Sequence, residues 1–150
     1  EHSAPGAIVE DKAFKAQKKR VMKIIDRWVK PMGLGWWRIT WVWDRESKHG
    51  ADNSEFYTVA ECAVNWQYKD VTITVYLPQV TEIKDDDRLE WAIVHELMHI
   101  LVAQMREAAA GEWSKHEERV CSDLASSFIW IRQHAERQTK KTKKGASAVA

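Results

Sequence analysis

Two histidines and one glutamate interrupt a strongly apolar stretch, WAIVHELMHI, at residues 91–100. On a helix, side chains four residues apart lie one above the other, so His95 and His99 point the same way. A polar side chain buried without a partner costs roughly 1–3 kcal/mol, which is large for a small domain. A bound cation removes this cost, because two neutral imidazoles at this spacing can bind one zinc ion. The spacing therefore predicts a Zn²⁺ site on His95 and His99.

Glu96 directly follows the first histidine, which completes the pattern HExxH. Its side chain leaves the helix about 100° round from His95. From there it can reach a water molecule activated by zinc more readily than the ion itself, which predicts a general base and not a ligand. The competing interpretation is a helix with two core histidines that hydrogen-bond to the backbone.

A catalytic zinc site takes three protein ligands and keeps one position open. The third ligand is expected in the following segment, SKHEERVCSDLASSFIWI. Glu117 lies in line with the apolar stripe of this segment, four residues before Cys121, whereas Glu118 lies roughly 100° away. The prediction is therefore Glu117, with Glu118 and His116 as alternatives. The competing interpretation makes Glu117 the third residue of a capping box that begins at Ser114.

Peptide hydrolysis also needs a donor that stabilises the developing oxyanion. Four residues are candidates, and each also has a structural interpretation: Tyr57, Tyr68, Tyr76 and His116. An extended substrate is expected to add as another strand beside residues 71–77.

Hydrophobic periodicity predicts the elements that position these residues. They are a helix over 12–30, strands over 36–45, 56–68 and 71–77, a helix from 85–87 to about 107, and a last helix over 114–138. The fold class is therefore α+β, with an N-terminal helix, about three antiparallel strands, the HExxH helix and a C-terminal helix that carries the third ligand.

Length and charge define the domain limits and exclude some partners. The 150 residues suit one domain over 11–138, between a disordered arm at 1–10 and a basic disordered tail at 139–150. The net charge of +1 argues against a nucleic-acid-binding body and leaves only a weak contact through the tail. No apolar run reaches membrane-spanning length, so no membrane partner is expected. The two separated cysteines are typical of free thiols in the cytoplasm.

HELMH, followed about seventeen residues later by HEERVCSDLASSF, resembles small single-domain HExxH metallopeptidases. These include proteins encoded by phages and prophages and the ImmA/IrrE-like peptidases, in which an acidic residue precedes a stretch similar to CSDLA. The Leu-Leu-Met-Pro ending of that branch is absent, and so is the metzincin HxxGxxH. SprT-like proteases take a histidine as third ligand, as His116 would be here.

The resemblance implies a minimal zincin-like fold that hydrolyses protein or peptide substrates with zinc, in the cytoplasm of a bacterium or a phage-infected host. Two other functions stay open. One is a non-catalytic zinc-binding module, structural or DNA-associated, in a phage. The other is a helical interaction domain without a metal.

Overall fold

The computed structural model describes residues 5–46, 58–106 and 113–147. Its elements are α1 (Pro5–Trp28), β1 (Arg38–Asp44), β2 (Ala60–Asn65), β3 (Asp70–Tyr76), α2 (Leu77–Glu82), α3 (Asp86–Arg106) and α4 (Trp113–Ser147). The predicted α+β class is confirmed by four helices and one three-stranded sheet. Within the described ranges, no helix combines the length and the apolar character needed to cross a membrane.

The sheet is mixed, with β3 in the centre and β1 and β2 at its edges. β2 and β3 form the predicted antiparallel hairpin, with Lys69 at a positive φ of 57° in its turn. The prediction of an antiparallel sheet is wrong for β1, which runs parallel to β3. Alternation of apolar and polar residues marks a strand but carries no information on its direction relative to a neighbour.

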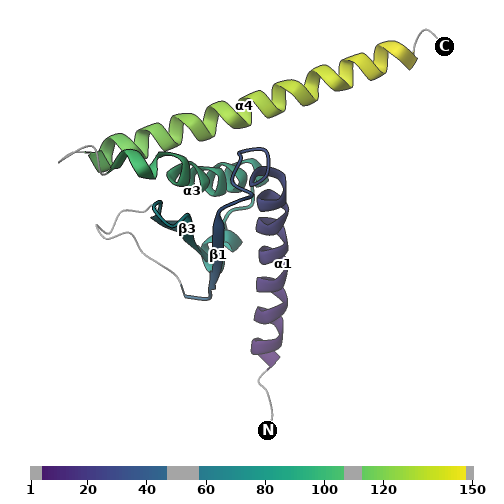
Figure 1. Ribbon diagram of the computed structural model, residues 1–150. Coiled ribbons are helices and arrows are strands. Elements are labelled where there is room, and N and C mark those ends of the chain that lie inside the picture. The colour runs from purple at the N-terminus through teal and green to yellow at the C-terminus, as the bar shows by residue number, and fades with distance from the viewer. Residues whose placement is uncertain (1–4, 47–57, 107–112, 148–150) are drawn as a thin grey trace.

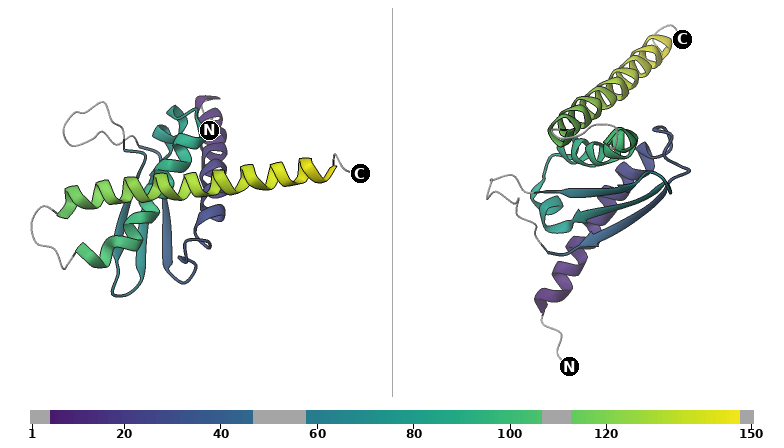
Figure 2. Two further views of the ribbon diagram at one scale, coloured as in Figure 1. Left: turned by 90° about the horizontal axis from the view of Figure 1, so that it is seen from above. Right: turned by 60° about the vertical axis from the view of Figure 1, so that its left-hand side comes forward.

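One face of the sheet is covered, and the other is open. Val71, Ile73 and Val75 of β3 are buried in the core together with residues of α1 and α3, whereas Thr72 on the opposite face is exposed. α3 lies between the sheet and α4 (Figure 1, Figure 2). α4 crosses α3 as an outer layer, and α1 runs beside the strands. α3 is therefore buried on two sides.

Burial on two sides changes which residues of α3 form the core. Its period predicts a main core stripe of Trp91, Val94, Met98, Leu101 and Met105. Val94 and Met98 are completely buried, but Trp91, Leu101 and Met105 are partly exposed. Three residues outside that stripe are also completely buried: Leu89, Ile93 and Leu97. A stripe read from one period assumes one buried face, and α3 has two.

The described residues near both ends of the chain are more helical than predicted, while residues 1–4 and 148–150 of the predicted arm and tail lie outside the described residues. Residues 5–10, expected to be a disordered arm, belong to α1, and residues 139–147, expected to be a disordered tail, belong to α4. Proline is favoured at the first position of a helix, as at Pro5, and residues 139–147 contain four lysines and one alanine, which propagate a helix well. The second half of α4 extends beyond the rest of the molecule (Figure 1).

A buried carboxylate ties three helices together behind the predicted site. Glu90 of α3 accepts hydrogen bonds from Trp28 Nε1 at 2.7 Å and Arg27 at 2.8 Å, both near the end of α1. Arg132 of α4 donates to its other oxygen at 2.7 Å. Because Glu90 is only 2% exposed, these bonds fix α4 against α3 in one register.

Candidate metal centre

His95 and His99 lie one turn apart on the side of α3 that faces α4. Both are buried, with 8% and 7% of their surfaces exposed. Their Nε2 atoms are 3.2 Å apart, so the two rings converge on one point. Burial lowers the pKa of His95 below its ordinary value of 6.5, and the charge of the neighbouring His99 lowers it further. Both effects favour the neutral form of His95, which is the form that binds metals.

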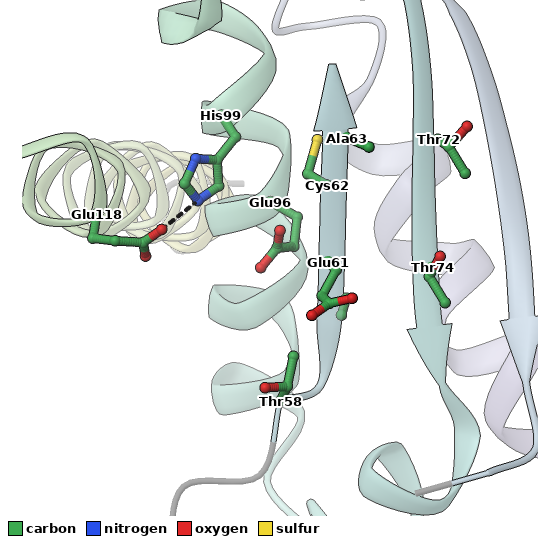
Figure 3. A pocket seen from close by; sticks show the side chains of 10 residues that line it. Thr58, Glu61, Cys62, Ala63, Thr72, Thr74, Glu96, His99 and Glu118 are labelled. Atoms are coloured by element: carbon green, nitrogen blue, oxygen red, sulfur yellow. Dashed lines mark ion pairs between the residues drawn. The ribbon is translucent and has the colours of Figure 1, made fainter. Parts of the chain in front are cut away.

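Glu118, from the first part of α4, closes this group. Its Oε2 lies 3.2 Å from His95 Nε2. Its Oε1 lies 3.4 Å from His99 Nε2, the ion pair drawn in Figure 3. A tetrahedral zinc ion with ligands at about 2.0–2.1 Å separates its ligand atoms by about 3.3–3.4 Å. The observed distances match this spacing, and the ligand atoms of the three residues all lie within 4.8 Å of one another. His95, His99 and Glu118 can therefore hold one metal ion.

Glu117 lies at a different ring nitrogen. Its Oε1 is 2.9 Å from Nδ1 of His99, on the side of the ring away from Nε2, and Cys121 Sγ is 3.5 Å from the same nitrogen. A carboxylate can only accept a hydrogen bond, so the contact places the ring proton on Nδ1 and leaves a lone pair on Nε2. The geometry thus favours Glu118 over Glu117, the first choice from sequence, as third ligand.

Glu117 and Glu118 differ in the side of α4 on which each lies. Glu117 does point along that stripe, and at 3% exposure it is fully buried. Its carboxylate, however, is stabilised by the N–H of a buried imidazole, so it needs no direct contact with a cation. Glu118, about 100° further round α4, reaches the more open side where both Nε2 atoms point.

α4 also supplies a neighbour for the second imidazole, which the sequence reasoning missed. Ser122 Oγ lies 3.4 Å from Nδ1 of His95. Ser122 follows Glu118 by four residues, so the two share a face of α4. That spacing is the signal that would have found it. Each histidine therefore has one nitrogen toward the candidate site and the other beside a polar side chain of α4, the arrangement that orients metal ligands in proteins.

Glu96 reaches from α3 into a cavity of about 500 Å³ beside this cluster (Figure 3). His99 and Glu118 line the same cavity. Burial, with smaller contributions from the charges of Glu118 and Glu61, raises the pKa of Glu96 from 4.5 to about 8. A carboxyl group with a pKa near neutrality can both accept and return a proton.

The opposite wall of the cavity comes from the sheet. Glu61, Cys62 and Ala63 of β2 line it, and Thr72 and Thr74 of β3 lie behind them. The prediction that a substrate pairs with residues 71–77 is wrong, because β3 is the central strand and both its sides are occupied. The edge beside the cavity belongs to β2.

None of the predicted oxyanion donors lines this cavity among the residues described. Tyr57 lies outside the described residues. Tyr68 is 67% exposed in the β2–β3 turn, and the hydroxyl of Tyr76 donates to Glu61 at 2.8 Å. His116, which was also an alternative ligand, is exposed and lies 3.4 Å from Arg119 instead of in the cluster.

Comparison of the chain with protein-family models, with curated proteins and with solved structures gave no match. Function is therefore argued from the site. The arrangement offers a place for one divalent cation, a carboxyl group with a raised pKa beside it and a cavity with a strand edge as its wall. Together these features suit hydrolysis of an extended polar substrate.

Proposed function

We propose that this protein is a zinc-dependent peptidase. The observation that carries the proposal is the convergence of the three-residue metal cluster and Glu96 on one cavity. His95, His99 and Glu118 would hold the zinc ion, and Glu117 would fix the orientation of His99. The resemblance of HELMH and its downstream helix to single-domain HExxH peptidases supports the same conclusion.

Zinc, when bound, would supply a Lewis acid that acidifies water and polarises the scissile carbonyl. The chain's own contribution begins with Glu96, which accepts a proton from the attacking water as its oxygen adds to the carbonyl carbon. Glu96 then returns that proton to the leaving nitrogen as the C–N bond breaks. The raised pKa of Glu96 in the metal-free chain, about 8, lies close to the range in which one group performs both transfers.

The edge of β2 would position the substrate. β2 pairs only with β3 among the described strands, so its other edge has backbone groups available to an added strand. A peptide along this edge would lie in the cavity that Glu96 and His99 also line, close to the metal cluster.

The experiment is metal analysis combined with a cleavage assay. Protein purified without chelator should contain about one zinc per chain, and His95→Ala should contain far less. Glu96→Gln should keep its zinc but lose cleavage of a proteome-derived peptide library by about 10²–10⁴-fold. Glu82→Gln, a change at an exposed carboxylate at the end of α2, is the matched control and should behave like wild type.

Three results would contradict the proposal. Full zinc content in His95→Ala would contradict the proposed metal site, and equal cleavage by wild type and Glu96→Gln would contradict the proposed mechanism. Stoichiometric zinc without any cleavage would instead favour a non-catalytic zinc module.

A further inference from the structure

We propose that Glu61 selects substrates that carry a lysine or arginine side chain next to the scissile bond. This inference rests on the proposed peptidase function, because it assigns the substrate class of the same cavity. Glu61 lies on the edge strand β2, across the cavity from Glu96 (Figure 3).

The register of the sheet decides where Glu61 points. Glu61 pairs with Thr74, and Ala63 pairs with Thr72. These four residues lie on the open face of the sheet, because Ile73 and Val75 between them face the core. The carboxylate of Glu61 thus stands on the open face while it also borders the cavity that contains Glu96 and His99.

A buried tyrosine holds this carboxylate in place. Tyr76, only 7% exposed, donates its hydroxyl to Oε2 of Glu61 at 2.8 Å. A hydrogen bond from a hydroxyl restricts the rotamer of the carboxylate that accepts it. The Glu61 carboxylate therefore has a fixed position relative to the strand edge, as a specificity determinant requires.

The charge around the cavity favours a cationic side chain. The carboxylates of Glu61 and Glu118 both border it, and the described residues that line it include no lysine or arginine. A bound divalent cation would be neutralised mainly by Glu118, which lies at the metal cluster, and not by Glu61 on the far wall.

Addition of a substrate strand to the edge of β2 would turn the position of Glu61 into a preference for a cationic substrate side chain. In an antiparallel pair, the residue opposite Glu61 projects from the same face, with its Cβ about 4.5–5.5 Å away, and opposite charges there are favourable. A substrate strand on the β2 edge therefore places one alternate side chain beside Glu61. Lysine or arginine at that position gains an ion pair, whereas glutamate there meets a like charge.

The test uses fluorescent peptides that carry Lys, Gln or Glu at one scanned position among uncharged residues. Cleavage is measured with wild type, Glu61→Gln and Glu61→Lys, and binding is measured by anisotropy with the same variants in a Glu96→Gln background. Wild type should prefer Lys over Gln by about fivefold at one position. Glu61→Gln should abolish that preference, and Glu61→Lys should reverse it toward Glu. Glu82→Gln should leave it unchanged.

The two readouts separate failure of the inference from failure of the proposed function. Cleavage without a charge preference, or a preference that survives Glu61→Gln, overturns the role of Glu61 and leaves the peptidase intact. Selective binding of Lys peptides without cleavage supports Glu61 and overturns the peptidase. If the peptides are neither bound nor cleaved, both the role of Glu61 and the peptidase function are overturned. Zinc content and a thermal melt of each variant show that it is folded, and the nearly isosteric Glu61→Gln decides the test if Glu61→Lys is unstable.

Discussion

Replacement of Glu96 by glutamine should stabilise the metal-free protein, and the gain should grow with pH. Glu96 is largely removed from solvent in the middle of α3 and lies near the charges of Glu118 and Glu61, so its ionised form is disfavoured in the folded chain. Glutamine has nearly the same shape and carries no charge. The variant therefore removes the ionisation cost of this one group.

The sign follows from proton binding in the two states. The pKa of Glu96 is about 8 in the folded chain, against the ordinary value of 4.5 that applies after unfolding. Between these values the folded state binds more protons than the unfolded state, so stability falls as pH rises from 4.5 to 8. At about 1.36 kcal/mol per pH unit, the full difference corresponds to about 5 kcal/mol. Side-chain relaxation and water entry reduce such penalties, and we expect a gain of at least about 1.5 kcal/mol.

Urea unfolding in excess chelator, at pH 5 and pH 8, measures this difference. The free energy of unfolding of Glu96→Gln minus that of wild type should be small at pH 5 and clearly positive at pH 8. Glu82→Gln controls for the general effect of removing a carboxylate. Saturating zinc should shrink the pH dependence, because a nearby cation favours the carboxylate. A difference between Glu96→Gln and wild type that is equal at both pH values would refute the reasoning.

Three further outcomes test the site and its supports. Glu118→Gln should weaken zinc affinity more than Glu117→Gln, whose loss should be about tenfold, as measured by competition with a chromophoric chelator; the reverse order would reinstate Glu117 as the ligand. Glu90→Ala should lower the free energy of unfolding in urea by about 3 kcal/mol, because it leaves buried donors unpaired. Glu136→Gln, which removes one partner of an exposed ion pair, should lower it by less than about 0.5 kcal/mol. Ile93→Ala should cost about 2–5 kcal/mol, since Ile93 is completely buried, and a smaller cost would mean that α3 packs more loosely than described.

The sequence was sufficient for every described element except the short helix α2, which was not predicted, and it was insufficient for their arrangement. Period-two alternation located β1, β2 and β3, and helical spacing located α1, α3 and α4. The parallel pairing of β1 was missed because strand direction depends on the path of the connection and not on the pattern within a strand. The central position of β3 was missed for the same reason, and with it the strand edge that faces the cavity.

The site shows a similar division. Residues on one helix have a fixed relation, so the convergence of His95 and His99 followed from their spacing of four. The choice between Glu117 and Glu118 depends on the rotation of α4 relative to α3, which contacts such as Glu90 with Arg132 set at a distance from the site. No property of the α4 segment alone encodes that rotation. Glu61 was missed because it reaches the cavity through the pairing of β2, far from the motif in sequence.

The energetic state of Glu96 distinguishes a catalytic site from a structural one. A zinc ion that only stabilises the fold needs its ligands and their hydrogen-bond partners, which His95, His99, Glu118 and Glu117 can supply. Glu96 adds nothing to that set, and its burial beside two other carboxylates makes the metal-free fold less stable above pH 4.5. A residue that lowers stability at a cavity wall is expected where function requires it. Retention of zinc by Glu96→Gln with higher stability and no cleavage would therefore assign Glu96 to the reaction, whereas unchanged stability would remove this argument.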